Sequence, residues 1–282
     1  MENSTFLKKM AESSYERVAK AKLIESEFKL SKAAKESIAP PLIYKNYFNI
    51  IAEIKKRSPA NGMLGSANFD LESQLKSYAS AKPLAVSILT ESEKFKGSLD
   101  DLSVASKIMK EYNIPVMRKD FLVDPYQLLE AKKLGASGAL LIASILSDDQ
   151  LDTLLACAAE NDLFILLESF DYHDIEKINK CALDKYINQG CSILSGVNCR
   201  NLKNLAIDFE RFKELSSLLP EQTIKVAESG IEKKEHVKKI VGLGYSVALI
   251  GSILMKSPNP EQLLKDLIKT GRSEVEVIKD CS

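Results

Sequence analysis

The sequence predicts an α/β protein: a (β/α)8 barrel (TIM barrel) over residues 48–282, with an N-terminal helical extension over residues 1–47. Short apolar runs recur eight times after residue 47, each bounded by turn-forming or charged residues. Amphipathic segments separate these runs, which is typical of parallel strands joined by helices. No GxGxxG motif follows the first run. The closed barrel is therefore favoured over an open doubly wound sheet.

The eight apolar runs are the predicted strands. Each is short and continuously apolar, as expected of a strand buried on both faces of a parallel sheet. In chain order they are FNIIAEI (48–54), LAVSIL (84–89), IPVMRKD (114–120), GALLIA (138–143), LFILLES (163–169), CSILSGVN (191–198), TIKVAES (223–229) and SVALIGS (246–252).

The segments between the strands are predicted helices. PYQLLEAKKLG (125–135) and DDQLDTLLACAAEN (148–161) have apolar residues at helical spacing and Gly or Asn near an end. Before the first strand, STFLKKMAESSYERVAKAKL (4–23) also predicts a helix, and a looser segment runs on to Pro40 and Pro41. We expect this extension to pack on the barrel and not to form a separate domain.

The composition excludes several classes of function. The 282 residues are 45% hydrophobic and 28% charged, which indicates a soluble globular chain with a large core. Lys plus Arg equals Asp plus Glu at 39 each, so no global charge favours nucleic acid or an anionic membrane. No apolar run approaches the roughly 20 residues of a membrane span, and the N-terminus lacks a signal-peptide core. We expect a cytoplasmic protein.

The five cysteines show neither the spacing of a zinc site nor that of a disulfide framework. Free thiols in a reducing cytoplasm explain them best. We therefore expect no metal in the site.

The first strand carries charge where a buried strand should be apolar. Side chains alternate along a strand, so Ile51, Glu53 and Lys55 share one face. A carboxylate and an ammonium are costly to bury unless they are paired or solvated. The pair is therefore expected at a strand end that opens into a wet pocket.

Other strand ends also carry polar side chains, and in this fold the carboxyl ends of the strands form the active-site mouth. Salt bridges that hold the rim together could explain any one of these residues, but an acid and a base facing one substrate explain the set better. We also expect neighbouring lysines to lower each other's pKa, which would help one to donate a proton. The polar residues expected at the mouth are Glu53, Lys55, Lys119, Glu168, Asn198, Arg200, Glu228 and Ser229.

The ends of the last two strands are rich in small residues. Ser229 and Gly230 follow the seventh strand, and Gly251 and Ser252 follow the eighth, where barrels often bind a phosphate through backbone N–H groups. A tight turn with positive φ would explain either glycine alone. The position of the pair favours a phosphate.

Two histidines and a cysteine are weaker candidates. His173 follows the fifth strand closely enough to be a minor candidate for proton transfer. His236 is expected on a solvated helix face. Cys199 is expected to pack in the protein and not to act as a nucleophile.

Seven pieces of sequence, in this order and on the expected strand ends, resemble the indole-3-glycerol-phosphate synthase family of tryptophan biosynthesis. AEIKKRSP (52–59) is the strongest, because it resembles the first-strand signature of that family. The resemblance covers nearly all of residues 1–270. The other pieces are SILTESEKFKGS (87–98), PVMRKDF (115–121), LLES (166–169), GVNCRNL (196–202), VAESGI (226–231) and ALIGSILMKSPNP (248–260).

The resemblance implies a reaction and a set of roles. The reaction is ring closure of 1-(2-carboxyphenylamino)-1-deoxyribulose 5-phosphate to indole-3-glycerol phosphate, with loss of CO2 and water and without a cofactor. Lys119 would be the general acid, Lys55 would bind the anthranilate carboxylate and donate a later proton, and Glu168 would be the general base of the dehydration. Glu53 and Asn198 would position the substrate hydroxyls and the lysines.

The resemblance also implies the contacts that bind this phosphosugar. The extension would partly cover the mouth, and other enzymes of the tryptophan pathway are possible partners. The expected substrate-binding residues are Arg200 at the carboxylate, Ser58, Ser229, Gly230, Gly251 and Ser252 at the phosphate, Leu89, Phe95, Phe121 and Leu140 around the aromatic ring, and Glu228.

Three features depart from the family pattern: Cys199, the run LLESFD (166–171), and Arg57, which is bulkier than expected. They flank the expected catalytic residues and do not replace them. We expect them to alter the local packing, and with it the rate or product release, while the identity of the acid and the base stays the same.

Three other functions stay open at this point. A phosphoribosylanthranilate isomerase would use a cysteine and an aspartate, whereas the first strand here ends with Glu53 and Lys55. A Schiff-base aldolase would form an imine on Lys55 or Lys119. A non-catalytic phosphosugar-binding or scaffolding barrel would have little use for an acid and a base together, although the fold alone does not exclude it.

Overall fold

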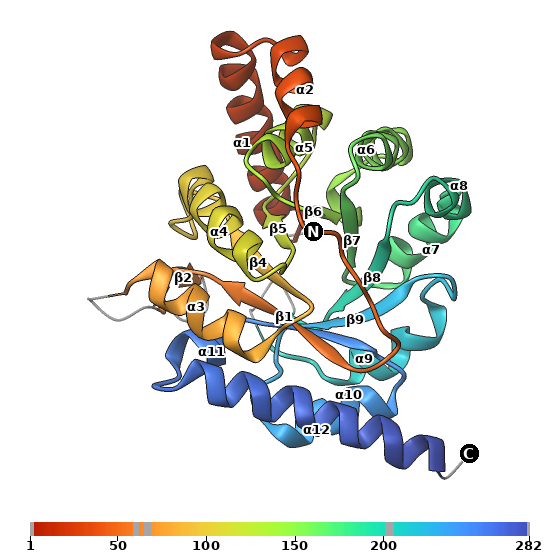
Figure 1. The fold of residues 1–282 in the computed structure, drawn as a ribbon. Helices are drawn as coiled ribbons and strands as arrows, with labels where there is room; N and C mark the ends of the chain where they lie inside the picture. The colour runs from red at the N-terminus through yellow and green to blue at the C-terminus, as the bar shows by residue number, and fades with distance from the viewer. Residues whose placement is uncertain (1–2, 59–61, 65–68, 201–205, 281–282) are drawn as a thin grey trace.

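The computed structural model describes residues 3–58, 62–64, 69–200 and 206–280 (Figure 1), apart from the side chains of residues 3–5 and 58. Eight parallel strands form a closed barrel, in which β1 pairs with β4 on one side and with β10 on the other. The predicted (β/α)8 barrel is therefore confirmed, and the open sheet is excluded. The barrel strands are β1 (Asn49–Ile54), β4 (Ala85–Leu89), β5 (Val116–Lys119), β6 (Gly138–Ile142), β7 (Phe164–Ser169), β8 (Ile193–Asn198), β9 (Ile224–Glu228) and β10 (Val247–Ile250).

Every barrel strand lies within the run that predicted it, because the strands are the continuously apolar segments. Alternation along β1 gives it two buried faces. Ile51 packs inside the barrel with side chains from other strands, whereas Ile50 and Ala52 pack outward against helices. Glu53 and Lys55 continue the inward series of Ile51 and line a pocket at the strand end, as predicted.

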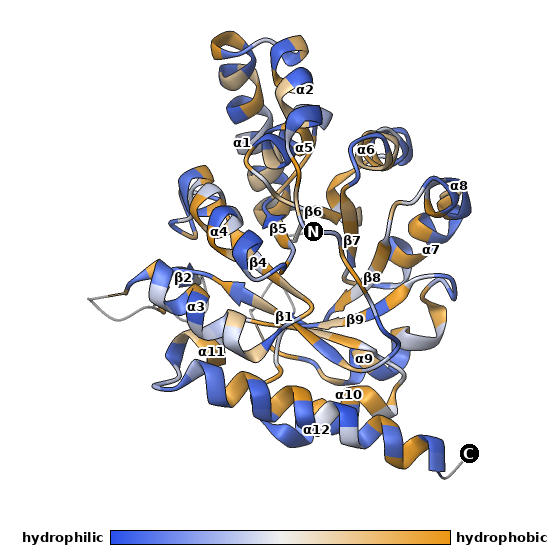
Figure 2. Ribbon diagram, viewed as in Figure 1, coloured by the Kyte–Doolittle hydropathy of each residue, from blue (hydrophilic) through white to orange (hydrophobic). Residues whose placement is uncertain are grey.

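Helices surround the barrel with their apolar sides inward, and Figure 2 shows the strands as its most hydrophobic part. Side-chain caps start many of the helices; Ser147 and Gln150, for instance, form a capping box at α6. The segments predicted as helices over 4–23, 125–135 and 148–161 match α1, α5 and α6. The helices are α1 (Asn3–Ile24), α2 (Glu27–Glu36), α3 (Leu71–Ala81), α4 (Leu99–Glu111), α5 (Pro125–Lys133), α6 (Asp148–Glu160), α7 (Tyr172–Lys180), α8 (Leu183–Asn188), α9 (Glu210–Leu215), α10 (Lys234–Gly242), α11 (Ser252–Lys256) and α12 (Pro260–Asp280), with short 3-10 turns η1 (Ala143–Ile145) and η2 (Ser216–Leu218). The short strands β2 (Arg57–Ser58) and β3 (Gly62–Met63) form an antiparallel pair outside the barrel.

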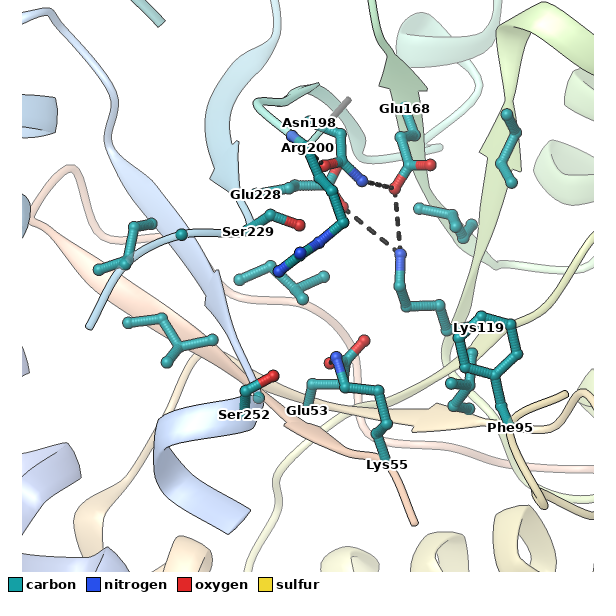
Figure 3. Close-up of a pocket in the computed structure, with 18 of the residues that line it drawn as sticks. Glu53, Lys55, Phe95, Lys119, Glu168, Asn198, Arg200, Glu228, Ser229 and Ser252 are labelled. Atoms are coloured by element: carbon teal, nitrogen blue, oxygen red, sulfur yellow. Dashed lines mark hydrogen bonds and ion pairs between the residues drawn. The ribbon is translucent and has the colours of Figure 1, made fainter. Parts of the chain in front are cut away.

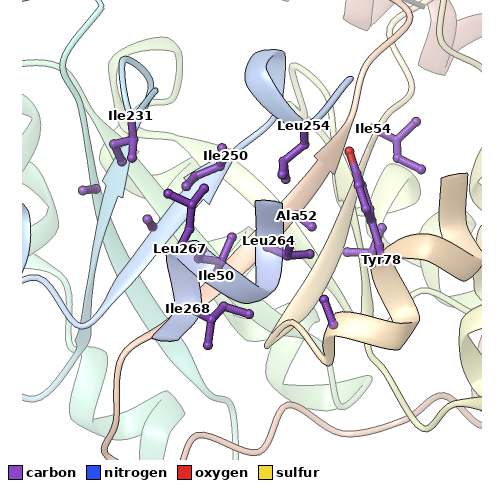
Figure 4. Packing of buried hydrophobic residues seen from close by; sticks show 14 of the residues in the cluster. Ile50, Ala52, Ile54, Tyr78, Ile231, Ile250, Leu254, Leu264, Leu267 and Ile268 are labelled. Carbon is purple, nitrogen blue, oxygen red and sulfur yellow. The ribbon is translucent and has the colours of Figure 1, made fainter. Parts of the chain in front are cut away.

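The C-terminal helix α12 covers the outside of β1 (Figure 4). Leu264, Leu267 and Ile268 are buried in the same cluster as Ile50 and Ala52. Their i, i+3, i+4 spacing forms one apolar stripe, so this helix stabilises the strand that carries Glu53.

The N-terminal extension forms a hairpin of α1 and α2 that packs on α5. Val18 and Leu30 of the hairpin are buried with Tyr126 and Leu129 of α5. The hydroxyl of Tyr126 also donates hydrogen bonds to backbone carbonyls at the end of α1, 2.9 and 3.1 Å away. Through these contacts the beginning of α1 is placed over the barrel mouth.

Cys157, Cys181, Cys191 and Cys199 are free thiols. Within the described residues no helix has the length and apolar character needed to cross a membrane. Across the same parts of the chain, no cluster of three or more His, Cys, Asp or Glu side chains is arranged to hold a metal ion.

Candidate active site

One pocket lies at the carboxyl ends of the barrel strands, and nearly all of the predicted site residues line it (Figure 3). Ser58 cannot be assigned, because its side chain lies outside the described residues. The predicted residues that line the pocket are Glu53, Lys55, Leu89, Phe95, Lys119, Phe121, Leu140, Glu168, Asn198, Arg200, Glu228, Ser229, Gly230, Gly251 and Ser252.

The charged pair of the first strand meets directly in the pocket. The Lys55 ammonium donates a hydrogen bond to Oε2 of Glu53, whose side chain is only 2% exposed. Burial alone would raise the pKa of Glu53, but Lys55, Lys119 and Arg200 together hold it below its ordinary value. Glu53 is therefore a carboxylate at neutral pH.

Lys119, the last residue of β5, lies among carboxylates. Its Nζ is 3.1 Å from Oε2 of Glu168 and 3.5 Å from Oε2 of Glu228. Burial alone would lower the pKa of Lys119, but Glu168, Glu228 and Glu53 outweigh it and raise this pKa above its ordinary value. The prediction that neighbouring ammonium groups lower the pKa of Lys119 is wrong, because the surrounding carboxylates have the larger effect.

The pKa of Glu228 is shifted in the opposite direction to that of Glu53. Burial, followed by repulsion from Glu168, raises its pKa well above the ordinary value. Within the described residues neither carboxyl oxygen of Glu228 accepts a hydrogen bond, and Lys119 is closer to Glu168. One lysine cannot pair closely with both carboxyl groups, so Glu228 holds a proton more tightly than an exposed glutamate does.

Asn198 orients the general-base candidate. Its Nδ2 donates to Oε2 of Glu168 at 3.2 Å, and its Oδ1 accepts from the backbone N–H of Arg200 at 3.0 Å. Glu168 therefore accepts hydrogen bonds from Asn198 and from Lys119 on the same oxygen.

Ser229 and Ser252, which follow β9 and β10, lie on the side of the pocket away from Phe95 (Figure 3), and Gly230 and Gly251 also line this pocket. Ser229 and Gly230 have φ of 72° and 70°, so the left-handed turn considered for Gly230 is present. A Cβ on Gly230 would also lie 2.5 Å from Cγ2 of Ile207.

Gly251 has a different role. Its φ is −126°, so a positive-φ turn does not explain it. A Cβ at this position would lie 2.1 Å from Oε2 of Glu53. Gly251 is therefore the space into which the Glu53 carboxylate fits, in addition to preceding the first turn of α11.

The histidine and cysteine predictions have mixed outcomes. His173 is exposed on α7 and does not line the pocket, so the minor proton-transfer hypothesis is wrong; the helix turns its side chain outward. His236 is half-buried, not solvated, because its ring packs 4.6 Å from that of Phe209 and its Nδ1 lies 3.1 Å from the carbonyl oxygen of Gly230. Cys199 is buried outside the pocket lining, and burial raises its pKa to about 12, which confirms a packing role.

The departures from the family pattern also have defined places. Cys199 Sγ donates to the carbonyl of Ser229 at 3.4 Å and so supports the turn after β9. Phe170, from LLESFD, lines the pocket, whereas Arg57 is exposed in β2 and does not.

Sequence reasoning missed several pocket residues. Phe6 of α1 packs edge-on to Phe121 with ring centroids 6.1 Å apart, and no local pattern relates two positions so distant in sequence. Asp120 could have been found, since it follows Lys119 directly. The missed lining residues are Phe6, Leu7, Asp120, Ile142, Phe170, Ile231, Glu232, Leu249, Ile250 and Ile253.

The fold and this site define a class of protein: a barrel enzyme whose pocket, at the carboxyl ends of the strands, gathers lysines and glutamates. Comparisons with known proteins identify the family. The family model of indole-3-glycerol phosphate synthase matches residues 7–267, and the chain belongs to this family.

Relatives and solved structures agree with this assignment. The indole-3-glycerol phosphate synthase of Aquifex aeolicus is 38% identical over 221 residues, 78% of this chain and 80% of that protein. The one from Campylobacter jejuni is 39% identical over 219 residues, again 78% and 80%. The structure of 3-hexulose-6-phosphate synthase from Salmonella typhimurium is 10% identical, with a TM-score of 0.59 over 80% of this chain and all of that chain, which shows the barrel fold alone.

Proposed function

We propose that this chain carries out the reaction of its family with Lys119 as general acid: it closes the ring of 1-(2-carboxyphenylamino)-1-deoxyribulose 5-phosphate to give indole-3-glycerol phosphate, CO2 and water. The observation that carries the proposal is the ammonium of Lys119, 3.1 Å from Glu168. In Figure 3 this ammonium lies between Phe95 and the side of the pocket that carries Ser229 and Ser252.

The first chemical step is attack of the carboxylate-bearing ring carbon on the substrate ketone. The ketone oxygen becomes an alkoxide, which is far more basic than an amine. Lys119 stays an ammonium at neutral pH because its pKa is raised, so it both stabilises the developing negative charge and supplies the proton.

The later steps restore the aromatic ring. Loss of CO2 returns the bonding electrons of the carboxylate to the ring system. Dehydration then needs an acid for the departing hydroxyl and a base for a ring proton. In our proposal Lys55 is the acid and Glu168 is the base, and Asn198 fixes the orientation of Glu168 through the 3.2 Å hydrogen bond.

Substrate binding follows the charge of the pocket. Lys55 and Arg200 hold the anthranilate carboxylate before it is lost as CO2. The phosphate lies at the small-residue end, where backbone N–H groups in a tight turn can converge on one anion. On the family pattern Ser58, Ser229, Gly230, Gly251 and Ser252 contact this phosphate, and Leu89, Phe95, Phe121 and Leu140 surround the aromatic ring. Glu53 positions the substrate hydroxyls, and Glu228 also contacts the substrate.

We also propose a division of the chain into two parts and a cellular location for the protein. Residues 1–47 are an extension that packs on the barrel, and residues 48–282 are the catalytic domain; the contacts of α1 and α2 with α5 support this division. We place the protein in the cytoplasm, beside other enzymes of tryptophan biosynthesis with which it can associate.

The experiment is to incubate the purified protein with the carboxyphenylamino-deoxyribulose phosphate and to record indole fluorescence and released CO2. We expect equal amounts of indole product and CO2. Sodium borohydride should trap no substrate on the protein, because no imine forms. A stable borohydride adduct on Lys55 or Lys119 would instead indicate an aldolase, and saturable binding without product would indicate a binding barrel.

A further inference from the structure

Arg17, in the middle of α1, forms a two-pronged ion pair with the residue next to Lys119. Its NH1 and NH2 donate to the two carboxyl oxygens of Asp120 at 2.9 and 2.8 Å. The Asp120 side chain is completely buried, whereas that of Arg17 is 29% exposed. This two-point geometry fixes the orientation of a carboxylate as well as its charge.

Asp120 in turn holds the backbone just after β5 in place. Its Oδ1 accepts the backbone N–H of Phe121 at 2.8 Å, and its Oδ2 accepts the hydroxyl of Thr90 at 2.7 Å. NH2 of Arg118 donates to the same Oδ2 at 3.4 Å. Asp120 therefore fixes the backbone between Lys119, the candidate acid, and Phe121, part of the aromatic wall.

The loop after β4, which carries the other wall residue, Phe95, is linked to the same ion pair, because Thr90 donates to Asp120 and the charge of Glu91 acts on Arg17. The carboxylate of Glu91 accepts three consecutive backbone N–H groups, including that of Phe95 at 3.0 Å. Burial alone would lower the pKa of Arg17, but Asp120 and Glu91 are among the acids that raise it. The guanidinium is thus a cation shared by the loops after β4 and β5.

Other contacts already tie the hairpin to the barrel. Ser14 Oγ accepts from Gln127 at 2.9 Å, and Lys133 donates to both carboxyl oxygens of Glu25 at 2.7 and 2.8 Å. The hairpin also shares a buried apolar cluster with α5. Arg17 is therefore not needed merely to attach the extension.

We propose that Arg17 is a positioning residue for the ring closure: by clamping Asp120 it sets the placement of Lys119 and of the aromatic wall over the substrate. This inference rests on the proposed function. It assigns to the extension a part in the chemistry that is distinct from covering the mouth.

The test compares Arg17→Met, which keeps an unbranched apolar stem and removes the guanidinium, with Glu25→Gln. The control removes an ion pair between the same hairpin and the barrel, far from the pocket. We expect Arg17→Met to lower kcat roughly tenfold or more, with a smaller change in KM, because misplacing a catalytic group costs rate. Arg17→Lys should restore only part of kcat, since an ammonium cannot bind both oxygens in the same way. Glu25→Gln should leave kcat unchanged.

A second measurement separates positioning from stability. In a Lys119→Ala background, Arg17→Met should reduce the residual rate by a clearly smaller factor than in the wild type, because one of the two groups that Arg17 places is gone. If Arg17→Met lowered the rate by the same factor in both backgrounds, the inference would be overturned. So would unchanged kcat in Arg17→Met beside an active wild type, even if the melting temperature fell. A wild-type protein that forms no indole product would instead refute the proposed function, and the inference with it.

Discussion

The charge state of the site depends on an excess of carboxylates around one lysine. Glu53, Glu168 and Glu228 all raise the pKa of Lys119, while Lys55 is paired with Glu53. Of these three carboxyl groups Glu228 lies farthest from a cation, 3.5 Å from Lys119, and burial and Glu168 raise its pKa well above the ordinary value. Lys119, with its raised pKa, is protonated in the resting site throughout the neutral pH range, so its charge does not switch with pH there.

Replacement of Glu228 by Gln tests this arrangement. The raised pKa of Glu228 favours its neutral form, so a neutral isostere should change kcat at pH 7 by less than about threefold. Glu168→Gln, which removes the candidate base, is the matched comparison and should cost roughly 10²-fold or more. A comparable loss in Glu228→Gln would show that the ionised form of Glu228 is required.

Gly251 tests the packing of Glu53. An added Cβ would lie 2.1 Å from Oε2 of Glu53, so Gly251→Ala must displace this carboxylate and with it the Lys55 ammonium. We expect kcat to fall roughly tenfold or more, because the charged groups leave their aligned positions. Gly242→Ala is the control, since a Cβ there meets no atom within 4 Å. Equal kinetics for the two variants would contradict the assigned role of Gly251.

At the scale of single elements, helix α7 places an acid in a costly position. Asp174 is buried in its first turn and accepts the backbone N–H of Phe170 at 2.8 Å. Burial raises the pKa of Asp174 from 3.8 to about 6. The folded state therefore binds this proton more tightly than the unfolded state does.

The raised pKa of Asp174 makes the stability of the fold depend on pH. Above pH 6 the fold must hold the buried carboxylate in its charged form, which lowers the free energy of unfolding. This penalty disappears as the pH falls towards 3.8, because the folded protein takes up the proton. The free energy of unfolding of Asp174→Asn should thus rise relative to the wild type by up to about 3 kcal/mol between pH 4 and pH 7. Urea unfolding at several pH values measures this difference, and a difference that is flat with pH would contradict the raised pKa.

At the scale of the whole molecule, α12 stabilises the strand beneath the site. Leu267 is fully buried in the cluster that includes Ile50 and Ala52. Leu267→Ala should lower the free energy of unfolding by about 2–5 kcal/mol through lost burial and a cavity. Val277→Ala on the same helix, at a side chain that is 55% exposed, should change it by less than about 0.5 kcal/mol. Chemical denaturation of both variants checks the contrast.

The barrel was predictable because its strands are continuous apolar runs, and most of the site was predictable because this fold puts functional residues at strand ends. The placement of Phe6 and Arg17 was not, since it depends on how α1 docks and no local periodicity encodes that. The pKa of Lys119 was predicted in the wrong direction because the sequence does not reveal how many carboxylates converge on it. Gly251 was assigned to a phosphate site, and its fit against Glu53 was not foreseen because it is a tertiary contact.

The central claim is that Lys119 supplies the proton for ring closure, and the most direct measurement is the steady-state rate of indole formation by Lys119→Ala beside the wild type. We expect kcat to fall by at least roughly 10²-fold, with a milder change in KM, because the variant keeps the pocket and loses the acid. Turnover of Lys119→Ala close to that of the wild type would contradict the claim.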